Sequence, residues 1–67
     1  MSKLKKLRED AGLSQDGLAD IAGVSRSMIS AIERGEREPS MTMIKLLAEG
    51  LGVSSRRVLN AVDPEFV

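Results

Sequence analysis

Residues 14–35, SQDGLADIAGVSRSMISAIERG, contain two short amphipathic segments separated by one glycine, Gly23. A serine precedes each segment, Ser14 the first and Ser25 the second. Serine is a preferred helix N-cap because its hydroxyl accepts a hydrogen bond from a free backbone amide. Gly23 and Gly35 stand where each segment should end, as is typical of a residue that follows a helix in the left-handed conformation. The stretch therefore predicts two short helices joined by a tight turn.

The apolar residues of these two segments recur at i, i+3 and i+4, so each predicted helix has one buried face. They are Leu18, Ala19, Ala22, Met28, Ile29 and Ile32. Two short helices joined by a glycine-containing turn form a helix-turn-helix motif, whose second helix enters the major groove of DNA. The motif at 14–35 therefore predicts DNA binding.

The rest of the chain predicts three more helices and no strand. Ser40 and Gly52 are the expected first and last caps of one of them, and Pro39 disfavours helical backbone at the residue before it. We expect residues 1–67 to form a single all-α domain of five helices. The predicted helices span approximately residues 2–11, 15–22, 26–34, 41–51 and 54–60.

The composition excludes most enzymatic chemistry. The 67 residues include no cysteine and no histidine, which removes disulfides, the usual metal ligands, and the commonest general bases and nucleophiles. We therefore expect no enzyme activity, no catalytic residue, no metal or other cofactor, and no small-molecule ligand. The N-terminus has no leader pattern, and no apolar run approaches the ~20 residues of a membrane span. A cytoplasmic protein without a membrane partner is the expectation.

Ten basic and ten acidic residues give a net charge of zero, whereas many nucleic-acid-binding modules are basic. The distribution of charges along the chain is more informative than the net charge, because a DNA phosphate responds only to charges within a Debye length of ~10 Å. Arg26, Arg34 and Arg37 lie on or just after the second helix of the motif. Neutrality therefore predicts modest non-specific affinity. We expect the lysines at 3, 5 and 6 to form a solvated face.

Two glycines lie inside predicted helices, where each should cost about 0.5–1 kcal/mol relative to alanine. We interpret Gly17 and Gly50 as residues on exposed faces. The alternative is a close backbone approach, to DNA at Gly17 or to a partner at Gly50. The methionines at 28, 41 and 43 are expected in the core or in an interface.

The C-terminal segment has more apolar surface than a domain this small can easily bury. Its apolar residues include Val58, Leu59, Val62 and Phe66, the only aromatic residue of the chain. We expect these residues to form a homodimer interface within residues 54–67. The alternative is that the chain is a fragment of a longer protein.

Five segments of the chain resemble the Cro/repressor-type helix-turn-helix family, also called the XRE family. They are LREDAGLSQ at 7–15, LA at 18–19, GVSRSMIS at 23–30, IERGEREPS at 32–40 and LAEGLGVS at 47–54. The resemblance covers roughly residues 4–60. It implies a five-helix fold, usually dimeric, with the third helix as the recognition helix. Gly17 departs from the pattern, because the family usually has a better helix former there.

The family includes phage repressors, restriction–modification controllers and antitoxins. The resemblance therefore implies a bacterial or phage-encoded transcriptional regulator that binds a two-fold operator in double-stranded DNA as a homodimer. An antitoxin that also holds a toxin is the alternative among DNA-binding proteins. A protein-interaction module that keeps the fold without binding DNA is the alternative of another class, and only the zero net charge favours it.

The resemblance also implies roles for residues at the edges of the motif. Gln15 would bind a phosphate, since a helix N-terminus offers free amides and a positive dipole end, unless it only starts a helix. Arg34 and Arg37 would hold the sugar–phosphate backbone without reading sequence. Arg37 has an alternative as an exposed partner of Glu36 or Glu38, a pairing of little energetic value.

The base-reading positions lie on the third helix and its cap. They are Ser25, Arg26, Ser27, Ser30 and Ala31. Arg26 is the best candidate because its fork can donate to O6 and N7 of guanine, and a phosphate contact is its alternative. Ser30 would reach a base or a phosphate, and Ala31 would touch a thymine methyl. Two further residues, Arg8 and Glu33, occupy positions that form a structural ion pair in the family.

Overall fold

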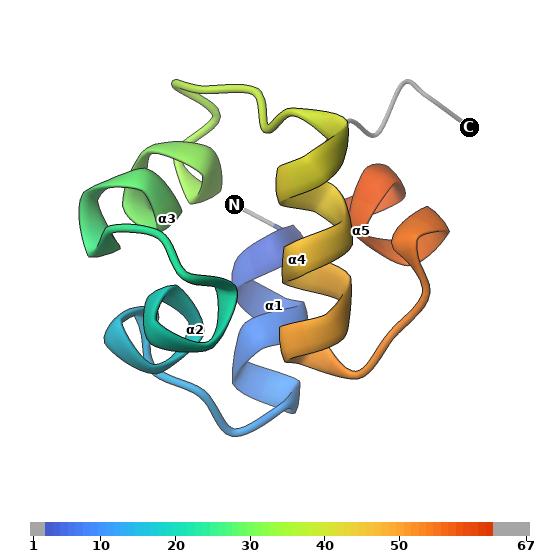
Figure 1. The fold of residues 1–67 in the computed structure, drawn as a ribbon, viewed down its shortest axis with the longest axis horizontal. Helices are drawn as coiled ribbons and strands as arrows, with labels where there is room; N and C mark the ends of the chain where they lie inside the picture. Colours follow the sequence, from blue (N-terminus) through green and yellow to red (C-terminus); the bar gives the residue numbers. More distant parts are fainter. Residues whose placement is uncertain (1–2, 63–67) are drawn as a thin grey trace.

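Residues 3–62, which the computed structural model describes, form five helices and no strand (Figure 1). The helices are α1 (Lys3–Asp10), α2 (Gln15–Ala22), α3 (Arg26–Glu33), α4 (Met41–Leu51) and α5 (Ser55–Val62). The all-α, five-helix prediction is confirmed. Helices α2 and α4 have the expected bounds, and those of the other three differ by one or two residues, the largest difference being that α5 continues two residues past its expected end.

Serine hydroxyls cap the N-termini of four helices. The Oγ atoms of Ser14, Ser25 and Ser40 accept hydrogen bonds from the backbone amides three residues further on, at 2.9, 3.1 and 3.1 Å. Ser54 does the same before α5, at 3.3 Å. Each cap satisfies an amide that has no partner inside the helix, so the short helices begin where the sequence predicts.

The helices share one core, to which every one of them contributes a fully buried side chain. The five residues are Leu4, Leu18, Ile29, Leu47 and Val58. Helix α4 lies between the α2–α3 pair and α5, and it packs against both α2 and α5 (Figure 1). Helix α1 packs against α3 and α5 and closes the arrangement. This core fixes the position of the α2–α3 pair relative to α1, and a residue of α1 contacts α3 in the site described below.

Gly50 does not lie on an exposed face, and the expectation for it was wrong. A Cβ added at Gly50 would come within 2.9 Å of Ile21 Cγ2 and 3.4 Å of Leu18 Cδ1. The glycine therefore permits a close approach between α4 and α2 of the same chain, not contact with a partner. Gly17 is half-buried as well, and a Cβ there would lie 3.2 Å from the hydroxyl of its own cap, Ser14.

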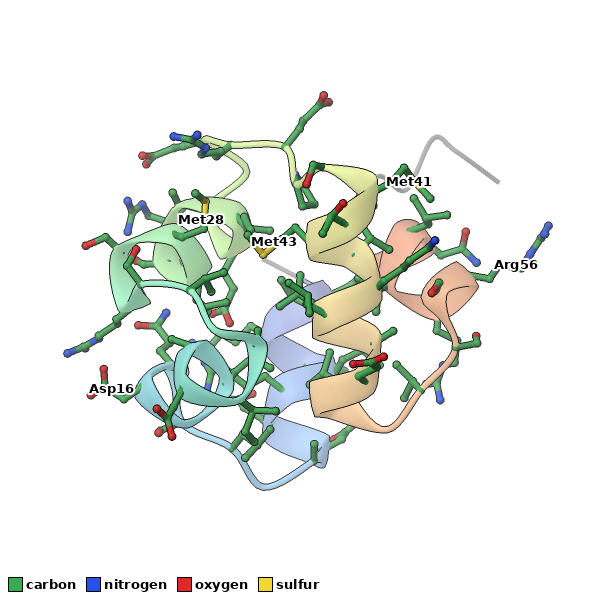
Figure 2. All side chains as sticks on the ribbon, viewed as in Figure 1. Asp16, Met28, Met41, Met43 and Arg56 are labelled. Carbon is green, nitrogen blue, oxygen red and sulfur yellow. The ribbon has the colours of Figure 1, made fainter. Side chains whose placement is uncertain are left out.

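The methionines divide into two groups. Met28 and Met43 are half-buried and pack against the core, whereas Met41 is 56% exposed at the first turn of α4 (Figure 2). Met41 is therefore not a core residue, and its alternative role in an interface stays a prediction. The sequence cannot make this distinction, because all three residues are equally apolar.

Candidate nucleic-acid interface

The start of α2 and the outer face of α3 form one polar depression of about 360 Å³. Its lining residues are Gln15, Arg26, Ser27, Ser30 and Arg34. All five are predicted DNA-contacting residues, and the fold brings them to one surface. The depression lies beside the capped N-terminal turn of α3, the part of a recognition helix that faces base edges.

Of the remaining predicted contact residues, Ser25 is exposed and caps α3, Ala31 is half-buried, and Arg37 is exposed in the loop after α3. The Ser25 hydroxyl already accepts a hydrogen bond from the Met28 amide, at 3.1 Å. Its proton is left to donate. Ser25 can therefore donate to an acceptor on a base or a phosphate while it caps the helix.

Arg26 is held loosely at the edge of the depression. Its Nε donates to Gln15 Oε1 at 3.5 Å and lies 3.9 Å from Asp16 Oδ1. The side chains of both charged residues are exposed, and Asp16 projects outward from the first turn of α2 (Figure 2). These long distances leave most of the Arg26 donor fork accessible to a ligand.

Gln15 connects this surface to the interior. Its Nε2 donates to Glu33 Oε1 at 3.2 Å, while its Oε1 accepts from Arg26. The Glu33 carboxylate only accepts hydrogen bonds, so it orients the Nε2 end of the amide toward itself, and one Nε2–H remains available for a phosphate oxygen. This link was missed at the sequence level, because Gln15 and Glu33 are 18 residues apart and no local pattern brings them together.

Arg8 and Glu33 form a buried ion pair that contacts Gln15, one of the residues of the depression. Arg8 Nε lies 2.7 Å from Glu33 Oε2, and its Nη2 donates to Oε1 at 3.3 Å. A third bond runs from Arg8 Nη1 to the Leu13 carbonyl at 2.8 Å. The hydrogen bond to Glu33 is the main cause that raises the pKa of Arg8 above its ordinary value. The pair thus connects α1 to the end of α3, and its glutamate accepts the hydrogen bond from Gln15.

Arg34, the C-cap of α3, forms a second ion pair at the surface. Its Nε lies 2.7 Å from Glu36 Oε2, its Nη2 donates to Glu36 Oε1 at 3.2 Å, and its Nη1 donates to Ser30 Oγ. The hydrogen bond from Arg34 is the main cause that lowers the pKa of Glu36. The alternative role of Arg37 was that of an exposed partner of Glu36 or Glu38. Arg37 forms no ion pair within residues 3–62, so this alternative is wrong for both glutamates.

The predicted dimer residues are not equivalent. Val58 is fully buried in the core of its own chain and has no surface left for a partner, so its assignment to an interface was wrong. Leu59 and Val62 are half-buried and pack against the core. Phe66 lies outside the described residues.

The lysines at 3, 5 and 6 are exposed, as expected of a solvated face, and Lys6 lies 4.0 Å from Asp10. Within residues 3–62, no cluster of acidic side chains could hold a metal ion. None of the helices described there is long and apolar enough to cross a membrane.

Comparisons with known proteins agree with this geometry. A family profile described as helix-turn-helix matches residues 4–58. The chain is 34% identical over 62 residues to y4dJ of Sinorhizobium fredii, an uncharacterized HTH-type transcriptional regulator, covering 92% of this chain and 80% of that one. It is 34% identical over 65 residues to control protein C.MunI of a Mycoplasma species, covering 96% and 88%. The crystal structure of the restriction-modification controller protein C.AhdI from Aeromonas hydrophila superimposes with a TM-score of 0.80 and 39% identity, covering 84% and 85%. The chain belongs to the XRE-type helix-turn-helix family of DNA-binding transcriptional regulators.

Proposed function

We propose that this regulator binds a two-fold operator as a homodimer, with α3 of each protomer in a major groove. The observation that carries the proposal is the polar depression at the start of α2 and the face of α3, lined by Gln15, Arg26, Ser27, Ser30 and Arg34. Two relatives named as control or controller proteins support a role in transcriptional control. A regulator of this kind acts without catalysis and in the cytoplasm, where it has access to DNA.

The contacts of each side chain suggest separate roles. Arg26 would read a guanine, since its fork is mostly accessible at the N-terminal turn of α3. Gln15 and Arg34 would position the protein on phosphates, with Arg37 as a further backbone contact from the loop. Around Arg26, we assign base contacts to Ser25, Ser27, Ser30 and Ala31.

Homodimerisation remains part of the proposal through α5 and the tail. Leu59 and Val62 keep part of their apolar surface exposed at the end of α5, and Phe66 follows in the sequence. A C2 dimer would place two α3 helices about 34–36 Å apart on one face of B-DNA. Leu59→Asp should then shift the sedimenting species from dimer to monomer at micromolar concentration. Equal sedimentation of the two proteins would rule out this interface.

Selection of bound sites from a pool of random duplexes tests the operator proposal. We expect a symmetric consensus and binding that weakens steeply with salt, because DNA-bound counterions are released. Arg26→Ala should flatten the preference at one base pair per half-site and cost about 1–3 kcal/mol on the selected operator, with little loss on random duplex. A consensus together with a stoichiometric protein partner would favour an antitoxin. No consensus together with such a partner would favour a protein-interaction module.

A further inference from the structure

Both cations of the polar depression already have a carboxylate partner from their own chain. Arg34 is paired with Glu36 at 2.7 Å, and Arg26 lies 3.9 Å from Asp16. These carboxylates lie beside the two arginines that we assign to DNA contacts. The N–O distance is shorter in the Arg34–Glu36 pair, so this pair should affect DNA binding more than the other.

The guanidinium of Arg34 is largely occupied in the free protein. Three of its five N–H groups are in use, two on the Glu36 carboxylate and one on Ser30 Oγ. The paired contact through Nε and Nη2 is also the arrangement by which arginine binds a phosphate. Glu36 thus occupies one of the two edges of Arg34 through which a DNA phosphate could be bound.

Glu36 is held in this place by the turn that ends α3. Gly35 has a φ of 76°, which reverses the chain, and the Glu36 amide donates to the Ala31 carbonyl at 2.9 Å. These are the features of a Schellman-type helix end. The backbone of Glu36 is therefore fixed beside Arg34.

We propose that Glu36 competes with DNA phosphates for Arg34 and thereby lowers the affinity of this protein for duplex DNA of any sequence. The inference rests on the proposed DNA-binding role of the α2–α3 surface. A phosphate must either displace the carboxylate or bind beside it, and in both cases the pair contributes almost no net positive charge. Both side chains are exposed, at 55% for Arg34 and 60% for Glu36, so water screens the pair and the competition weakens binding without abolishing it.

The test compares Glu36→Gln with Glu38→Gln. Both variants remove one negative charge from the same exposed loop, but Glu38 forms no ion pair within residues 3–62. Affinity for a fluorescent random-sequence duplex is measured by anisotropy over a series of salt concentrations. Glu36→Gln should bind about two- to fivefold more tightly than wild type at low salt, in line with the strength of exposed ion pairs. Its plot of log affinity against log salt should steepen by about 1 per protomer, and Glu38→Gln should change both quantities much less.

A second arm repeats both changes in an Arg34→Gln background, where the gain from Glu36→Gln should disappear. Circular dichroism spectra that match wild type establish that the variants are folded. If wild type binds duplex with normal salt dependence but both variants bind equally, the competition is absent while the proposed function stands. Weaker binding by Glu36→Gln would make Glu36 a positioning residue and would also overturn the inference. A wild type without salt-dependent binding would overturn the proposed function itself.

Discussion

Two arginine–glutamate pairs in this molecule have the same shortest N–O distance, 2.7 Å, and lie in opposite environments. The side chains of Arg8 and Glu33 are 9% and 5% exposed, whereas those of Arg34 and Glu36 are 55% and 60% exposed. Distance therefore does not distinguish the two pairs, and burial does. The first pair connects helices of the core, and the second lies on the surface that we assign to DNA.

The buried pair depends on its neighbours as well as on its own attraction. Removing two charges from water is costly, and the cost is met only when the remaining polar atoms are also bonded. Arg8 donates additionally to the Leu13 carbonyl, and Glu33 accepts additionally from Gln15. Within the described residues, no buried side-chain nitrogen or oxygen lacks a partner. The exposed pair needs no such network, because water solvates either group when the other leaves.

The largest effect should follow from breaking the buried pair on one side. Arg8→Met should lower the free energy of unfolding by about 3–5 kcal/mol, because it leaves the charge of Glu33 buried without its partner. A loss of that size is a large fraction of the stability of a domain this small, so the urea midpoint should fall steeply. Urea unfolding followed by circular dichroism measures it, with Arg34→Met as the matched control. If Arg8→Met and Arg34→Met have equal urea midpoints, the buried and the exposed pair do not differ in their contribution to stability.

Replacing both partners of the buried pair should restore much of the lost stability. Arg8→Met combined with Glu33→Leu leaves no isolated charge and fills a similar volume, and such exchanges are often neutral or stabilising. A double-mutant cycle with the two single variants should give a coupling of about 2 kcal/mol or more. Additive losses would show that the two side chains act independently of each other.

Gln15 should give an intermediate effect, because it joins the buried network to the surface. Gln15→Leu removes one hydrogen bond to a charged group and should destabilise by about 1–2 kcal/mol. Gln15→Glu should cost more, since it places a second carboxylate beside Glu33. Binding to random duplex should weaken in Gln15→Leu without a change in salt slope, because glutamine carries no charge. A change of slope would contradict a purely positioning role.

The smallest effect concerns the titration of Glu36. Arg34 holds the pKa of Glu36 below its ordinary value, so the carboxylate should stay ionised to lower pH than a free glutamate. The stabilisation from the pair is present above the ordinary glutamate pKa and is lost as the pH falls through the lowered pKa. Carboxyl NMR shifts of Glu36 measured against pH should show this, and Arg34→Gln should return the pKa to its ordinary value. An unchanged titration in Arg34→Gln would show that the pair does not persist in solution.

The sequence predicts the helices well because their signals are local. A serine such as Ser25 and a glycine such as Gly23 mark a boundary within a few residues of the amide or carbonyl that they serve. Periodicity also finds the core, but it cannot tell a residue buried in its own chain from one buried by a partner. This is why Val58 was assigned to the wrong environment.

The site is less predictable because its contacts join distant residues or depend on rotamers. Arg8 and Glu33 are 25 residues apart, and only the family resemblance indicated their pairing. The pair of Arg34 with Glu36 is local but was missed. Its signal was present in Gly35, whose left-handed backbone brings the next side chain back toward the end of α3. The close approach at Gly50 had no local signal, since its neighbours come from α2.

The three bonds of Arg8 also bear on how the molecule opens. One side chain joins α1, the Leu13 carbonyl that follows it, and the last turn of α3. If α1 detached alone, Glu33 would keep its charge in a partly apolar site with only Gln15 as a donor. Because detachment of α1 would break all three bonds of Arg8 at once, we expect α1 and α3 to open as one cooperative unit. Backbone amides of α1 should exchange with deuterium as slowly as those of α3, although α1 lies close to the end of the chain.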